Sequence, residues 1–137
     1  MRHLVSLKTI DSLSPIEGAD RIEKATIGGW EVVVGKGLHQ QGDKVIYLEI
    51  DSVLPEGNPV FEEFMKHGVK NVTKVDGDEV RGHVLRTIRL RGQYSQGAIL
   101  PLSVTGLSPD ATVEEVDQWG KSQGVFKYCL LYTSDAA

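Results

Sequence analysis

The side chains best suited to bind a phosphate group are concentrated between residues 81 and 100. Four of the chain's six arginines lie in this segment, which contains no aspartate or glutamate. The four are Arg81, Arg86, Arg89 and Arg91. The segment therefore has a formal charge of +4, whereas the chain as a whole has −4. Positive charge gathered on one segment of an acidic protein predicts a directed phosphate-binding surface rather than a diffuse polycation.

Residues 83–90 alternate with the period of a β-strand, and this period predicts which way the arginines point. One face carries Val84, Arg86, Ile88 and Leu90, and the other carries Leu85, Thr87 and Arg89, with Arg91 at the end of the strand. We expect the mainly apolar face to pack on a core and the other face to present Arg89 and Arg91. The alternative is a solvated edge strand whose charges only prevent edge-to-edge aggregation.

The next residues, 92–97, combine two glycines with short polar side chains and one aromatic ring, and a second apolar run follows at 98–100. This pattern predicts a hairpin-like pair of strands joined by a loop. The loop would place amides, a hydroxyl and a ring beside the arginines. The candidate binding residues are Arg89 and Arg91 as phosphate partners, Gln93, Ser95 and Gln96 as hydrogen-bonding groups, and Tyr94 as a stacking residue.

Length and composition indicate one soluble globular domain with a real core, since the 137 residues are 40% hydrophobic and 25% charged. No apolar run approaches a membrane span and the N-terminus does not resemble a signal peptide, so we expect a cytoplasmic protein without a membrane partner. Cys129 is the only cysteine, which excludes an intramolecular disulfide and argues against a thiolate zinc site. The four histidines are scattered without ligand spacing. We therefore expect no metal or cofactor site in this chain.

Short strands separated by turn residues dominate the rest of the sequence. Strands are expected over 4–10, 22–27, 30–34 and 44–50, in addition to the pair at 83–100. Asn58-Pro59 predicts the start of a short helix that Gly68 ends, and Thr112 to Glu115 matches a capping box that opens a second helix. Residues 11–15 are expected to form a turn, 69–81 a mobile polar loop, and 124–128 the start of a linker.

Five or six short strands with one or two short helices predict a mainly β fold, a small closed barrel of the OB-fold type. The expected domain covers residues 1–128, with a helix and loop insertion at 55–81 and a connection toward a further domain at 103–128. OB-folds commonly bind oligonucleotides, and Trp30 and Tyr94 could stack on bases. Alternatively, Trp30 packs in the core behind its hairpin.

The last nine residues, 129–137, have no cap, no amphipathic period and no turn pattern. Their codons would match the transposon-end adapter that is attached to DNA in sequencing libraries. We therefore expect an adapter-derived tail, a native frame that breaks off near Tyr128, and a longer parent protein.

Two segments resemble a known family. Residues 15–55, with Glu49-Ile50-Asp51-Ser52 and Leu54-Pro55, and residues 85–102, with Arg91-Gly92-Gln93 and Ser95-Gln96-Gly97, look like the N-terminal module of a family of ATP-dependent RNA ligases. In that family an OB-like domain precedes the adenylyltransferase domain.

The resemblance implies that the parent seals nicks in RNA, joining a 3′-hydroxyl to a 5′-phosphate through a lysyl-AMP intermediate, with ATP and Mg²⁺ as cofactors. The implied partners of this chain are RNA, as a nicked duplex or structured RNA, and a covalently linked downstream adenylyltransferase domain. Lys74-Val75-Asp76-Gly77 has the letters of a nucleophile motif but lies in a polar segment without the acidic, lysine-bearing strand motifs that must follow it. We therefore expect Lys74 to be structural or phosphate-contacting, and no catalytic residue in this chain.

Two other functions remain open. Pro15, Ala19, Asp20, Arg21 and Ile22, with Ser95 and Gly97, also resemble the tRNA-binding OB modules attached to some aminoacyl-tRNA synthetases. This alternative is a non-catalytic RNA-binding module. The third possibility, suggested by the acidic net charge, is an interaction domain that binds no nucleic acid. The oligomeric state is not predicted.

Overall fold

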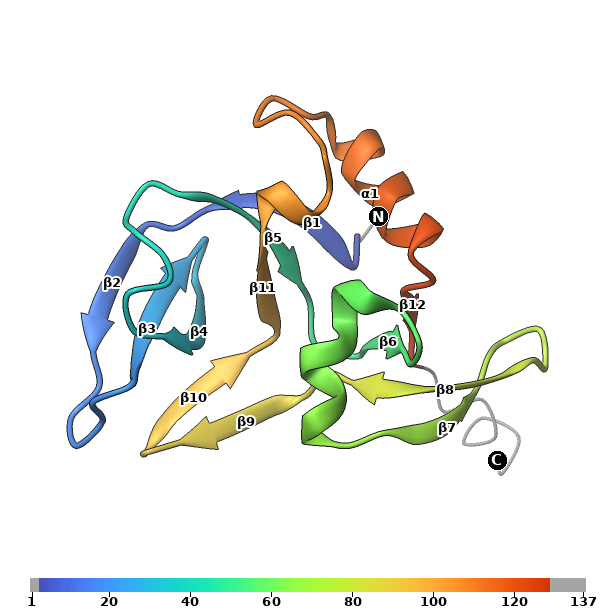
Figure 1. Cartoon of the computed structure of the whole chain (residues 1–137), viewed down its shortest axis with the longest axis horizontal. Coiled ribbons are helices and arrows are strands. Elements are labelled where there is room, and N and C mark those ends of the chain that lie inside the picture. The colour runs from blue at the N-terminus through green and yellow to red at the C-terminus, as the bar shows by residue number, and fades with distance from the viewer. Residues whose placement is uncertain (1–2, 129–137) are drawn as a thin grey trace.

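The computed structural model describes residues 3–128, and these residues form a mainly β structure (Figure 1). The predicted fold class is confirmed. The strands are β1 (Val5–Thr9), β2 (Ser12–Pro15), β3 (Ile22–Ile27), β4 (Trp30–Gly35), β5 (Lys44–Leu48), β6 (Ser52–Pro55), β7 (Lys70–Thr73), β8 (Glu79–Val84), β9 (Thr87–Leu90), β10 (Gln93–Gln96), β11 (Ala98–Pro101) and β12 (Phe126–Lys127). The helices are the 3₁₀ segments η1 (Pro59–His67) and η2 (Leu102–Val104) and the α-helix α1 (Val113–Ser122).

The backbone hydrogen bonds of the described residues group these strands into separate sheets rather than one closed barrel. The sheet orders are β1-β5-β11, β2-β3-β4, β10-β9 and β12-β6-β8-β7. The prediction of five or six strands in a closed barrel was therefore wrong in strand number and in closure. The strands are only two to six residues long, and the chain turns after each one. No continuous ladder joins β4 to β10, although the two strands are neighbours.

β5 lies at the centre of the molecule and is buried on both faces. Ile46 and Leu48 pack into a core shared with β1, β6, η1 and α1, whereas Val45 and Tyr47 pack into a second core with β3 and β4. This alternation matches the sequence pattern of the strand. The Trp30 ring stacks on the Tyr47 ring, with 6.1 Å between the centroids. Trp30 therefore packs on the core, as the alternative to base stacking proposed.

Local signals placed both predicted helices correctly. The Asn58 side chain accepts a hydrogen bond from the Val60 backbone N–H, and Gly68 follows the last residue of η1. At α1, the Thr112 hydroxyl accepts from the Glu115 N–H at 3.1 Å and the Glu115 carboxylate accepts from the Thr112 N–H at 2.8 Å. This reciprocal pair is the predicted capping box.

Four segments that were expected to be irregular form strands. Residues 11–15 contain β2, residues 69–81 contain β7 and the start of β8, the 92–97 loop contains β10, and the expected linker at 124–128 contains β12. Each of these strands pairs with a neighbouring strand and buries few apolar side chains. In β7, for example, Val72 is buried and lies opposite Val80 of β8. A strand with one buried residue among polar ones has the composition of a loop. The predicted adapter-derived tail, 129–137, lies outside the described residues.

No helix among residues 3–128 is both long enough and apolar enough to span a membrane.

Candidate nucleic-acid interface

The β9–β10 hairpin extends from the central strands and ends in a two-residue turn (Figure 1). The turn residues are Arg91 and Gly92, with φ angles of 52° and 82°. Two successive positive φ angles are typical of a type I′ turn, which favours Asn-Gly or Gly-Gly. An arginine in this conformation costs about 1–3 kcal/mol. The sequence therefore places a cation at the tip where asparagine or glycine would be less strained.

The outer face of the hairpin carries an arginine beside an aromatic ring. Arg89 lies directly across from Tyr94 in the antiparallel register. The Arg89 guanidinium lies 5.5 Å from the centroid of the Tyr94 ring, within the range of a cation–π interaction. Tyr94 is 55% exposed and Arg89 is also exposed. Gln96, opposite Thr87, shares this face. Arg89, Tyr94 and Gln96 therefore lie together, with Arg91 at the adjacent tip.

The inner face of the hairpin is attached to β4 by side-chain hydrogen bonds. The buried Ser95 hydroxyl accepts from the Val33 backbone N–H at 2.9 Å. The Gln93 side-chain amide donates to the Glu31 carboxylate at 2.9 Å. Hydrogen bonds from Gln93 and Lys24, with the positive charge of Lys24, hold the pKa of Glu31 below its usual value. These contacts replace a backbone ladder between β4 and β10. Of the predicted site residues, Gln93 and Ser95 thus face the protein body.

We predict that Ser95→Ala will destabilise the protein by about 1–2 kcal/mol, because the Val33 N–H at the free edge of β4 loses its acceptor. Chemical denaturation measures this difference, and Ser6→Ala is a control because the Ser6 hydroxyl is buried without a hydrogen-bond partner. Equal stability of the Ser95→Ala variant and the unsubstituted chain would show that the Ser95 hydroxyl does not link β10 to β4.

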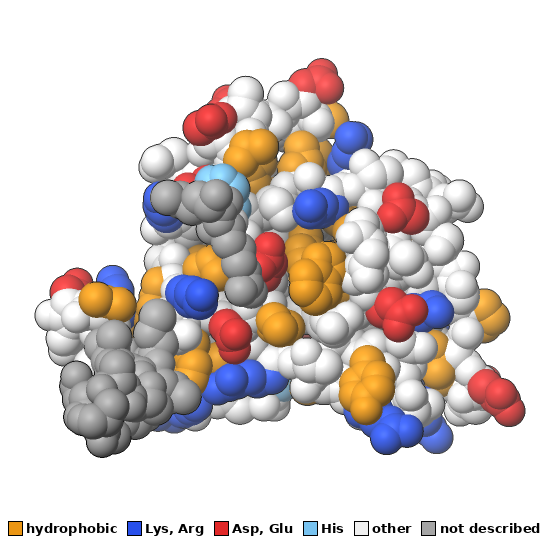
Figure 2. All heavy atoms as spheres, turned by 180° about the vertical axis from the view of Figure 1, so that it is seen from behind, with side chains coloured by type: hydrophobic (Ala, Val, Ile, Leu, Met, Phe, Trp, Pro, Cys, Tyr) orange, Lys and Arg blue, Asp and Glu red, His pale blue; other side chains and the backbone are white. Residues whose placement is uncertain are grey.

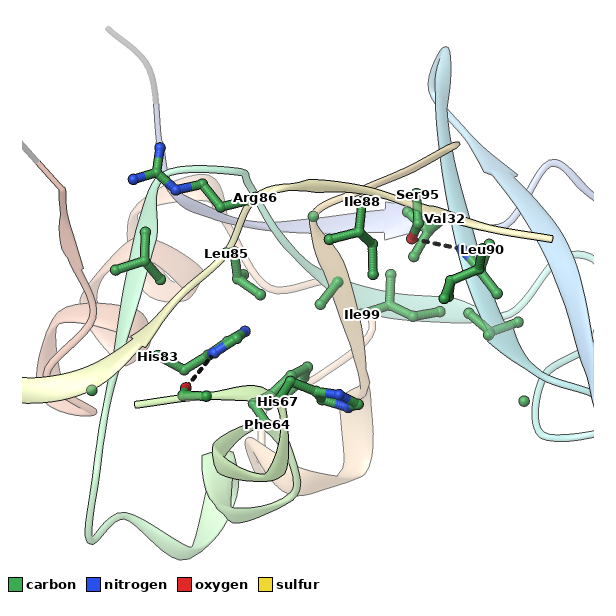
Figure 3. Close-up of a pocket in the computed structure, with 18 of the residues that line it drawn as sticks. Val32, Phe64, His67, His83, Leu85, Arg86, Ile88, Leu90, Ser95 and Ile99 are labelled. Carbon is green, nitrogen blue, oxygen red and sulfur yellow. Dashed lines mark hydrogen bonds between the residues drawn. The ribbon is translucent and has the colours of Figure 1, made fainter. Parts of the chain in front are cut away.

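The inner face also lines an open cavity of about 830 Å³ (Figure 3). Ile88 and Leu90 of β9 form one wall, and Phe64 and His67 of η1 lie across from them. Ile88 is 50% exposed and Leu90 is 39% exposed. The predicted apolar face of the 83–90 strand is therefore buried in a core at Val84 but borders an open cavity at Ile88 and Leu90.

Arg86 does not belong to that apolar face. The strand is interrupted at Leu85 and Arg86, and the exposed Arg86 side chain forms an ion pair with Asp51 at 3.3 Å. Its guanidinium also lies 4.7 Å from the centroid of the Tyr128 ring. Sequence reasoning missed this contact because the two residues are far apart in the chain. It also missed Lys70, whose Nζ lies 4.6 Å from the same ring centroid.

Within residues 3–128, no group of three or more His, Asp or Glu side chains is close enough together to hold a metal ion. The His67 and His83 ring centroids are 6.3 Å apart, and the His83 Nδ1 is 2.7 Å from the Gly68 carbonyl oxygen.

A family model described as an OB-fold domain matches residues 4–102. The chain belongs to this OB-fold domain family. The OB-fold prediction is thereby confirmed, although the backbone ladders of the described residues do not close. The match covers β1 to β11 and so includes the β9–β10 hairpin.

Solved structures of one RNA ligase are similar to this OB-fold chain. Naegleria gruberi RNA ligase with PPi has 35% sequence identity and a TM-score of 0.76, over 94% of this chain and 36% of that one. A mutant of the same ligase with AMP and Mn has 34% identity and a TM-score of 0.76, over 93% and 35%. The chain thus spans about a third of the ligase, at its N-terminal end. No curated protein sequence matches.

Proposed function

We propose that this OB-fold chain is the RNA-binding N-terminal module of an ATP-dependent RNA ligase. In the proposed parent, a downstream adenylyltransferase domain would form lysyl-AMP, transfer the AMP to a 5′-phosphate and join that phosphate to a 3′-hydroxyl, with ATP and Mg²⁺ as cofactors. The likeness to the Naegleria gruberi ligase over nearly the whole of this chain supports the parent activity. A cytoplasmic location is part of the same proposal.

The observation that carries the RNA-binding proposal is the outer face of the β9–β10 hairpin. Arg89, Arg91 and Tyr94 are exposed together there, and none of the three has an acidic partner among the ion pairs of residues 3–128. Guanidinium groups suit phosphate, and an exposed ring suits an unpaired base. The strained φ of Arg91 also favours a functional reason for arginine at the tip.

The DNA that follows codon 128 in the source tests the ligase assignment. We expect an open frame that encodes an adenylyltransferase domain with a lysine nucleophile. A synthetase body or a stop codon at that point would instead select the tRNA-binding or free-standing module and contradict the ligase proposal.

We predict that the purified chain forms no covalent adenylate, because the one near match to a nucleophile motif is in a hairpin. Lys74 follows β7, and its backbone N–H donates to the Asp78 backbone carbonyl at 2.7 Å. Its Nζ lies 5.3 Å from the Phe126 ring centroid. Incubation with radiolabelled ATP and Mg²⁺ followed by denaturing electrophoresis is the measurement. A labelled band that Lys74→Ala removes would contradict both the assignment of Lys74 and the absence of a catalytic site.

A further inference from the structure

A second group of cations lies on the sheet β12-β6-β8-β7, outside the hairpin face described above. We name it the β7–β12 basic cluster, formed by Lys70, Lys74, Arg86, Phe126 and Tyr128. The ring of Tyr128 lies between Lys70 and Arg86, at 4.6 and 4.7 Å from its centroid, and Lys74 lies 5.3 Å from the Phe126 centroid. Each cation of the cluster thus contacts an aromatic ring.

The cluster is built on a packed sheet face. Lys70, Val72 and Lys74 alternate along β7 and its end, and the buried Val72 packs with Val53 and Val84. Phe126 and Tyr128 pack against the same valines. The period of two brings both lysines to the side of the sheet that carries the rings. The rings are therefore fixed by the sheet, and they hold the lysines in place.

The cations of the cluster keep their charge available. No ion pair among residues 3–128 involves Lys70 or Lys74. Arg86 contacts Asp51 through one nitrogen, which leaves the other donors of its guanidinium for a further acceptor. A cation–π contact restrains a lysine without neutralising it, so less side-chain entropy is lost when an anion binds.

The cluster is connected along the chain to the hairpin through Arg86. Arg86 immediately precedes β9, and Figure 2 shows Lys and Arg side chains in two groups at the lower left and lower right of the molecule, with mostly uncharged surface between them. Lys70 and Lys74 are about 13 Å apart along the strand. Along the axis of a duplex, each strand has one phosphate per ~3.4 Å, so that length spans about four phosphates of one strand.

We propose that the β7–β12 basic cluster binds the phosphate backbone of the same RNA that contacts the β9–β10 hairpin. This inference rests on the proposed RNA-binding function and extends its surface from the hairpin tip, through Arg86, to β7. The competing explanation is structural: the lysines only cover the rings and protect the exposed edge of β7 from pairing.

The test is a salt titration of RNA binding by the full chain, followed by fluorescence anisotropy with a labelled single-stranded RNA. The variants are Lys70→Gln/Lys74→Gln, the conservative Lys70→Arg/Lys74→Arg, and Arg89→Ala/Arg91→Ala. The matched control is Lys36→Gln/Lys44→Gln, which removes the same charge from two exposed lysines on other elements. Two lost phosphate contacts should lower the salt slope by about 1.4.

We expect the glutamine pair to lower the slope by this amount, the arginine pair to retain it, and the control pair to leave it unchanged. An unchanged slope for the glutamine pair, while Arg89→Ala/Arg91→Ala lowers it, would overturn this inference and leave the hairpin as the RNA surface. If the unsubstituted chain does not bind RNA, the proposed function itself would be overturned.

Discussion

Replacing Gly97 with alanine is expected to destabilise the protein by roughly 2–6 kcal/mol, the sum of about 1–3 for a strained backbone and about 1–3 for overpacking. Gly97 joins β10 to β11 with a φ of 85°, which L side chains rarely adopt. A Cβ there would lie 2.8 Å from the Tyr47 hydroxyl and closer still to the Leu48 carbonyl oxygen. The Tyr47 hydroxyl already donates to the Gln96 carbonyl at 2.6 Å.

Gly77→Ala is the matched control for this experiment. Gly77 has a φ of 96°, and a Cβ at that position would meet nothing within 4 Å. It therefore measures the backbone cost alone. Denaturant titrations that give similar m-values for both variants allow the comparison. If Gly97→Ala costs no more than Gly77→Ala, the hairpin is not held tightly against β5, and its side chains are not positioned as described.

Replacing Tyr94 with alanine is expected to weaken binding of single-stranded RNA by about 1–3 kcal/mol with little change in salt slope, because a stacking ring is lost and no charge is removed. The ring is 55% exposed and is held by the Arg89 guanidinium at 5.5 Å. The Tyr94→Phe variant keeps the ring and should bind RNA with the same affinity as the unsubstituted chain. Equal affinity of the alanine and phenylalanine variants would show that no base stacks on Tyr94.

Local rules in the sequence predicted the elements whose causes are local. Asn58, Thr112 and Glu115 act within three residues of the backbone groups they cap, so sequence spacing is sufficient to place them. β5 alternates between two apolar faces, and both faces are buried. The strand at 87–90 and the apolar run at 98–100 were predicted, but the expected loop between them is strand β10, which pairs with β9.

The parts that sequence reasoning missed depend on distant partners. Ser95 was expected in the binding loop, but its hydroxyl bonds Val33, 62 residues away. Arg86 was assigned to an apolar face, but the strand breaks there and the side chain reaches Asp51. Lys70 and Lys74 were expected in a mobile polar loop, but Lys70 begins strand β7 and Lys74 follows its last residue. This strand forms by pairing with β8, and a single sequence does not display pairing.

RNA binding by the outer face of the β9–β10 hairpin is tested most directly by the affinity of the chain for a nicked duplex with an RNA 3′-hydroxyl strand, measured across a salt series. The comparison is between the unsubstituted chain and the Arg89→Ala/Arg91→Ala double variant. We predict that the double variant binds more weakly and with a shallower salt dependence. The slope of log K against log salt concentration should fall by about 0.7 per lost phosphate contact on a single strand, and by somewhat more on a duplex. If the double variant binds as tightly and with the same salt dependence as the unsubstituted chain, the outer face of the hairpin is only a charged edge, and the proposal that it binds RNA is wrong.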